Sequence, residues 1–138
     1  MSRPTEARLA GTREEMEISA DEVADLLRTI ANRNRLMIVC LLAEGEYSVG
    51  ELEKQLGIRQ PTLSQQLTVL REAGIVETRR NAKNIVYRLT DEKAARVVEA
   101  LYVIFCGRRK RPRAQRRPFE VDEGKEYDSY ESSPAGGC

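Results

Sequence analysis

Residues 58–89 read IRQPTLSQQLTVLREAGIVETRRNAKNIVYRL, and this stretch decides the fold. Leucines recur in it at spacings of four and three residues, at Leu63, Leu67 and Leu70. Such spacing is the buried stripe of an amphipathic helix. Pro61 suits the first turn of this helix, and Gly74 follows its last apolar residue as a stop. The stretch therefore predicts a helix that begins near Pro61 and ends near Gly74.

Two short β-prone runs follow, at residues 75–78 and 85–89, with a polar, basic turn between them. Upstream, Ser48 and Glu51 form a capping box that opens a short helix, and Gly57 ends it. Two helices joined by three or four residues are typical of a helix-turn-helix. With the basic hairpin, they predict a winged helix-turn-helix, mainly α with a small β-hairpin.

Three further helices are expected around this unit. Ser19 and Glu22 form a capping box for a helix at about 20–31. Residues 36–42 are almost wholly apolar and predict a central, buried helix. Thr90 is a plausible N-cap for a last helix that runs to about Cys106. Its apolar stripe consists of Ala94, Val97, Val98, Leu101, Tyr102 and Phe105.

So small a domain has too little core of its own to cover the last helix. We therefore expect a homodimer formed through the first and last helices, whose two-fold symmetry matches palindromic DNA half-sites. The predicted organisation is a flexible N-terminal segment at 1–18, a DNA-binding and dimerisation domain at 19–106, and a disordered tail at 107–138. The tail is first basic and then acidic.

Composition excludes several classes of function. No apolar run approaches the roughly 18 residues that cross a bilayer, and the N-terminus lacks the apolar region of a signal peptide. A cytoplasmic protein without a membrane partner is therefore expected. The 138 residues include no histidine, which rules out Ser-His-Asp and Cys-His catalysis. No Gly-rich phosphate loop is present either, so we expect neither an enzyme nor a cofactor.

The polar side of the 61–74 helix and the basic turn are the candidate DNA interface. Residues near the N-terminus of such a helix reach base edges in the major groove, and glutamine can pair with adenine. The candidate contacts are Gln60, Thr62, Ser64, Gln65, Thr68, Arg79, Arg80 and Lys83. A polar helix face alone is more typical of an ordinary solvent-exposed surface. The basic hairpin that follows favours DNA, because residues 59–88 hold six basic side chains against two acidic ones.

Two cysteines, Cys40 and Cys106, lie within predicted helices, and a third, Cys138, lies in the tail. Free cysteines are common in protein cores, so inert packing is one interpretation of Cys40 and Cys106. A reactive thiol pair is the other, and it requires thiolate character and access for reagents. The residues alone leave both open.

The stretches ANRNRLMIVCLLAEGEYSVGELEKQLGIRQPTLSQQLTVLREAGIVETRR (31–80) and KAARVVEALYVIFC (93–106) resemble the ArsR-type winged-helix repressors. Within that family they are most similar to the branch of the biofilm repressor BigR and the sulfide-responsive repressor SqrR. The contexts of the two cysteines, Ile-Val-Cys40 and Ile-Phe-Cys106, carry the resemblance to the branch.

The resemblance implies a homodimeric repressor of sulfide-response genes. It implies release of double-stranded operator DNA when persulfide or polysulfide cross-links Cys40 and Cys106. Arsenic sensors of the family carry a Cys-x-Cys pair where this chain has Ser48 and Gly50, and zinc sensors use histidines that it lacks. No metal site is therefore expected. The alternatives are a general oxidant or thiolate-metal sensor of the same fold, and a dimeric interaction module that does not bind DNA.

Overall fold

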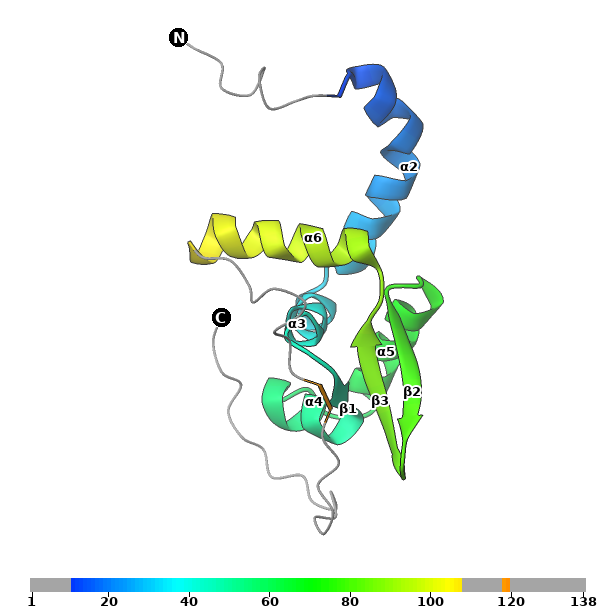
Figure 1. The fold of residues 1–138 in the computed structure, drawn as a ribbon, viewed down its shortest axis with the longest axis vertical. Helices are drawn as coiled ribbons and strands as arrows, with labels where there is room; N and C mark the ends of the chain where they lie inside the picture. The colour runs from blue at the N-terminus through cyan, green and yellow to red at the C-terminus, as the bar shows by residue number, and fades with distance from the viewer. Residues whose placement is uncertain (1–10, 108–117, 120–138) are drawn as a thin grey trace.

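The structure, a computed structural model, describes residues 11–107 and 118–119. Its helices are α2 (Arg13–Ile30), α3 (Arg33–Leu42), α4 (Val49–Leu56), α5 (Thr62–Glu72) and α6 (Glu92–Leu101), and a π-helical turn η1 (Tyr102–Cys106) continues α6. The strands are β1 (Tyr47–Ser48), β2 (Val76–Asn81) and β3 (Asn84–Leu89). The fold is mainly helical with a small antiparallel sheet (Figure 1). It confirms the predicted winged helix-turn-helix, with α4 and α5 as the two helices and β2–β3 as the wing.

The sheet has three strands in the order β1-β3-β2. The wing pairs in register from Val76 opposite Leu89 to Asn81 opposite Asn84. Strand β1 adds Tyr47 opposite Tyr87 on the other edge of β3. The sequence predicted only the hairpin, because a strand of two residues carries no alternation that could reveal it.

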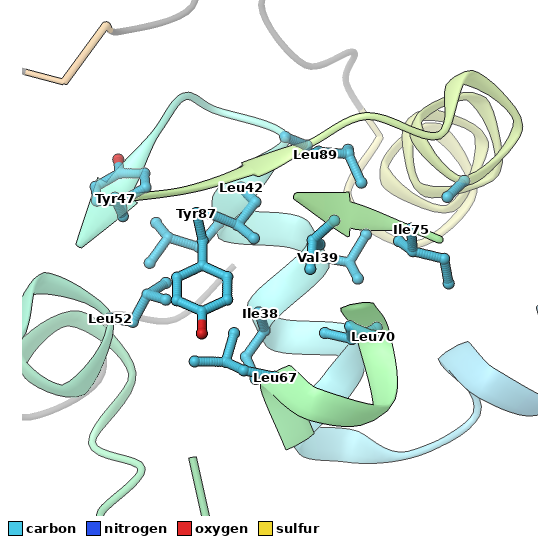
Figure 2. Packing of buried hydrophobic residues seen from close by; sticks show 14 of the residues in the cluster. Ile38, Val39, Leu42, Tyr47, Leu52, Leu67, Leu70, Ile75, Tyr87 and Leu89 are labelled. Carbon is cyan, nitrogen blue, oxygen red and sulfur yellow. The ribbon is translucent and has the colours of Figure 1, made fainter. Parts of the chain in front are cut away.

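Helix α3 lies at the centre of the fold (Figure 1). It packs against α2, α4, α5, α6 and β3. Its buried side chains are Ile38, Val39, Leu41 and Leu42, and Figure 2 shows three of them among leucines of α4 and α5 and aromatic residues of the sheet. The prediction of a central, buried helix is confirmed. The helix begins earlier than predicted, at Arg33, because the side chain of Asn32 accepts hydrogen bonds from the first backbone N–H groups.

The two helices of the helix-turn-helix have the predicted limits. Both halves of the Ser48–Glu51 capping box are formed, and Gly57 ends α4 at a φ of 67°. Gly74 follows α5 at a φ of 74°, a left-handed conformation that suits glycine. The predicted apolar stripe is buried beneath α5, with Leu63, Leu67 and Leu70 at 0–1% exposure.

Helix α2 corrects the predicted start of the first helix. It begins at Arg13, and its capping box is formed by Thr12 and Glu15. Ser19 therefore lies inside the helix and caps nothing. Both residue pairs fit the same capping pattern, and the helix propagates through Ser19 because the upstream pair already satisfies its free N–H groups.

The start of α6 corrects one further expectation. Asp91, not Thr90, is the N-cap of α6, since its carboxylate accepts from the N–H groups of Lys93 and Ala94. The helix reaches Cys106 as predicted, but its last turn is π-helical. Phe105, the last residue of the predicted stripe, is 79% exposed in the single chain.

The N-terminal part of α2 projects away from the rest of the fold, and the rest of α2 lies near the start of α6 (Figure 1). An ion pair between Glu22 and Lys93 links the two helices. Large apolar side chains stay exposed on α2 at Met16, Ile18, Val23 and Leu27, and on η1 at Val103, Ile104 and Phe105. Within the described residues, no helix is long and apolar enough to span a membrane.

Replacing Leu67 by alanine is expected to lower the free energy of unfolding by about 3 kcal/mol, because a fully buried leucine leaves a cavity under α5. Val69 on the same helix is 38% exposed, and Val69→Ala is expected to cost less than about 1 kcal/mol. Urea unfolding followed by circular dichroism measures both. Equal losses for the two variants would contradict the burial of the leucine stripe.

Candidate functional site

The buried leucines of α5 fix which side of this helix faces outward. With Leu63, Leu67 and Leu70 in the core, Ser64, Gln65 and Thr68 lie on the exposed side, as predicted. Thr62, at the flank, is half-buried. The fold thus brings the predicted polar contacts of α5 together on one surface.

Several of these side chains are engaged with one another. Pro61, the N-cap of α5, provides no side-chain cap. Gln60 takes this role, since its Oε1 accepts from the backbone N–H of Ser64 at 3.0 Å and from its hydroxyl at 2.5 Å. The hydroxyl of Thr68 donates to the carbonyl oxygen of Ser64 at 2.8 Å. The side chain of Gln65 is exposed and makes no hydrogen bond to another described residue, so its amide has its full capacity for an outside partner.

The wing carries the three predicted basic contacts, but they are not equivalent. Arg80 and Lys83 are exposed. Arg79 forms a bidentate ion pair with Glu46, with Nε to Oε1 and Nη2 to Oε2 both at 2.8 Å. Its guanidinium is thus already bound by the protein. Sequence reasoning missed Glu46, because 33 residues separate the partners and no local pattern links them.

The carboxylate of Glu46 is held in its charged form. Its pKa lies below the ordinary value of 4.5, chiefly because of the hydrogen bonds from Arg79, while partial burial opposes this. The backbone N–H of Phe119 donates to the same carboxylate and lowers the pKa further. Phe119 lies in the segment for which the sequence predicted disorder, yet it is only 7% exposed.

Arg35 on α3 joins three helices. Its Nε donates to the carbonyl oxygen of Thr29 near the end of α2 at 2.5 Å. Its Nη1 donates to Oε1 of Gln66 on α5 at 2.8 Å. The central helix is therefore tied directly to the helix that presents the polar surface, by a contact that no local sequence pattern could reveal.

The two predicted sensing cysteines lie in different parts of the helical scaffold. Cys40 is on α3, half-buried and packed against the core. Cys106 is the last residue of η1 and is also half-buried. Helix α3 packs against α6, the helix that η1 continues. Cys138 lies outside the described residues.

In the part of the chain that the structure describes, no three His, Cys, Asp or Glu side chains are grouped so that they could hold a metal ion. Ser48 is the N-cap of α4 and Gly50 lies in its first turn. Neither residue offers a metal ligand at the start of the helix-turn-helix.

A polar helix face above a leucine stripe, beside a basic wing, defines a winged helix-turn-helix DNA-binding protein. Residues 32–78 match the sequence profile of the bacterial regulatory proteins of the arsR family. The chain is 68% identical over 99 residues to the biofilm growth-associated repressor of Xylella fastidiosa (strain 9a5c), which covers 72% of this chain and 87% of that protein. The chain therefore belongs to the ArsR family of transcriptional regulators, which are not enzymes.

Solved structures agree with this assignment. The crystal structure of the repressor BigR from Xylella fastidiosa matches with a TM-score of 0.68 at 69% identity, covering 70% of this chain and 98% of that one. Reduced HlyU from Vibrio cholerae matches with a TM-score of 0.63 at 39% identity, covering 67% and 98%. The homodimeric winged helix-turn-helix domain of Mb0332 from Mycobacterium bovis matches with a TM-score of 0.56 at 34% identity, covering 69% and 88%.

The Glu46–Arg79 pair predicts a pH dependence of stability. Because the pKa of Glu46 is lowered in the folded protein, the pair stabilises the fold at pH values above 4.5. This contribution is lost as the pH falls below 4.5 and through the lowered pKa. A carbon-detected NMR titration of the Glu46 carboxyl measures the midpoint, which Arg79→Gln should raise. Arg80→Gln is the control, and an equal rise there would contradict a specific pair.

Proposed function

We propose that this protein is a homodimeric transcriptional repressor that leaves its operator when reactive sulfur species bridge Cys40 and Cys106. The observation that carries its DNA-binding part is the exposed polar face of α5 beside the basic wing. The high identity to a biofilm growth-associated repressor supports repression rather than activation. Since a repressor acts where the chromosome lies, we place the protein in the cytoplasm. Sulfide-response genes are its proposed targets.

In this proposal α5 is the recognition helix and enters the major groove. Gln65 makes the base contact, because its amide can donate and accept at the edge of adenine. Gln60, Thr62, Ser64 and Thr68 position the helix on the backbone through phosphates or base edges. Arg80 and Lys83 reach neighbouring phosphates or the minor groove from the wing. Arg79 does so only when it leaves Glu46.

The exposed apolar side chains of α2 and η1 support a dimer through the first and last helices. Ile18, Ile104 and Phe105 are 86%, 69% and 79% exposed in the single chain. Large apolar side chains left exposed in this way are typical of an interface. The homodimeric state of the related Mb0332 domain supports the same assembly. A two-fold dimer would place two recognition helices about one turn of DNA apart.

The sulfur chemistry needs only thiols and a persulfide. Each cysteine thiolate takes the outer sulfur atom of a low-molecular-weight persulfide and releases that molecule as a thiol. One protein persulfide then displaces hydrosulfide from the other and closes a three-sulfur bridge. Two cysteines and two persulfides thus give one bridge, two thiols and one H₂S. A direct disulfide requires Cα atoms within about 4.4–6.8 Å, so added sulfur widens the range of separations that can be bridged.

The fold supports a route from the bridge to DNA. A bridge would tie α3 to the end of the last helix, and α3 is hydrogen-bonded to α5 through Arg35 and Gln66. Movement of α3 against α6 therefore changes the position of α5 relative to the dimer axis. A mismatch of about 2.7 kcal/mol between helix spacing and half-site spacing lowers DNA affinity a hundredfold.

Gln65→Ala is expected to weaken operator binding about five- to 150-fold, because one good bidentate base contact contributes about 1–3 kcal/mol of discrimination. The operator is obtained by selection from a random duplex pool, and affinity is measured by fluorescence anisotropy. Gln55→Ala, the same change at an exposed position of α4, is the control and should change affinity less than twofold. Unchanged affinity in Gln65→Ala would support the interaction-module alternative.

Cys40→Ser and Cys106→Ser should each bind operator like the wild type but fail to release it after persulfide treatment. Cys138→Ser is the matched control and should release it normally. Mass spectrometry of the treated wild type should show added sulfur between the Cys40 and Cys106 peptides. Release by peroxide with a plain disulfide would establish a general oxidant sensor instead, and release by zinc would establish a metal sensor.

A further inference from the structure

The middle of the wing carries an ion pair that keeps one of the proposed DNA contacts engaged with the protein. Glu46 directly precedes β1, and Arg79 lies on β2, so their ion pair ties the wing to the segment that leads into α4. The side chain of Glu46 is only 20% exposed, against 43% for that of Arg79. The carboxylate is thus the more enclosed partner of the pair, and the Arg79 side chain is the more exposed one.

Phe119, in the C-terminal segment, contacts the same carboxylate. Its backbone N–H donates to Glu46, and the residue is only 7% exposed. Figure 1 shows the short described segment at residues 118–119 beside β1. Phe119 is therefore enclosed, with its backbone N–H against the carboxylate that binds Arg79.

We propose that Phe119 docks beside Glu46 as an autoinhibitory anchor that keeps Arg79 on Glu46 and away from the DNA backbone. The inference rests on the proposed DNA binding and concerns its regulation. A guanidinium bound bidentately to a carboxylate has its best donors occupied and cannot bind a phosphate with them.

Docking of Phe119 and binding of DNA then compete for the side chain of Arg79. Docked Phe119 adds a hydrogen bond that orients the Glu46 carboxylate toward Arg79. Released Phe119 leaves Glu46 more exposed to water, where an ion pair with Arg79 is weak and a phosphate competes with it. Because coupling is reciprocal, DNA that captures Arg79 also favours release of Phe119.

The docking is tested first without DNA. In the full chain, NMR hydrogen exchange should show a protected amide at Phe119, and Glu46→Ala should remove this protection. Glu77→Ala is the matched control, since Glu77 is another wing carboxylate and pairs with Arg88 at 3.5 Å. An amide at Phe119 that exchanges as fast as in a free peptide would overturn the docking.

The competition is tested on a random-sequence duplex of about 30 base pairs, some three helical turns. Phe119→Ala and Glu46→Gln should each raise affinity about two- to fivefold, the range that loss of one exposed ion pair can give. Each should also steepen the plot of log K against log salt by about one to two units per dimer, as each protomer gains one phosphate contact. Phe119→Leu, which keeps an apolar side chain, should resemble the wild type.

The gain in DNA affinity must depend on Arg79. In an Arg79→Gln background, Phe119→Ala should therefore change neither affinity nor salt slope. Wild-type affinity in Phe119→Ala, or an equal gain in Glu77→Gln, would overturn the inference. Failure of every variant to bind the duplex would overturn the proposed DNA binding instead, and the amide exchange of Phe119 would still report the docking.

Discussion

The burial of α3 is the constraint on which the rest of the structure depends. This one helix packs against four other helices and the middle strand of the sheet. Protein interiors are close-packed, so a helix enclosed in this way cannot shift without moving its neighbours. Its sequence, with seven consecutive apolar residues at 36–42, leaves it no stable place on the surface. A shift of α3 therefore also moves α5, the proposed recognition helix.

This constraint is what the proposed thiol sensor would use in so small a domain. The thiol of Cys40 is on the helix that four other helices and β3 contact, whereas Cys106 is at the far end of η1. The proposed bond between them would act on the centre of the fold. Arg35 adds a polar connection from the same helix to Gln66 on α5. Packing and this hydrogen bond together supply the contiguous physical link that coupling between two sites needs.

Local sequence signals predicted most of the fold, and non-local contacts account for what they missed. The leucine stripe and the glycine at each end placed α4 and α5 correctly, because helix periodicity and chain reversal depend on neighbouring residues. The two-residue strand β1 and the Glu46–Arg79 pair depend on partners distant in sequence. The polar surface of α5 was predictable, but its internal hydrogen bonds required the structure.

Those internal hydrogen bonds bear on specificity. The side chains of Gln60 and Ser64 are hydrogen-bonded to each other, and the hydroxyl of Thr68 donates to a carbonyl of its own helix. A contact between DNA and one of these groups must therefore share or replace an existing hydrogen bond. The net gain from exchanging one hydrogen bond for another is small. Gln65 has no such bond to give up among the described residues, so a base contact from it carries little compensating loss. Sequence discrimination in each half-site should therefore depend mainly on this one side chain, with the other polar groups setting the orientation of the helix.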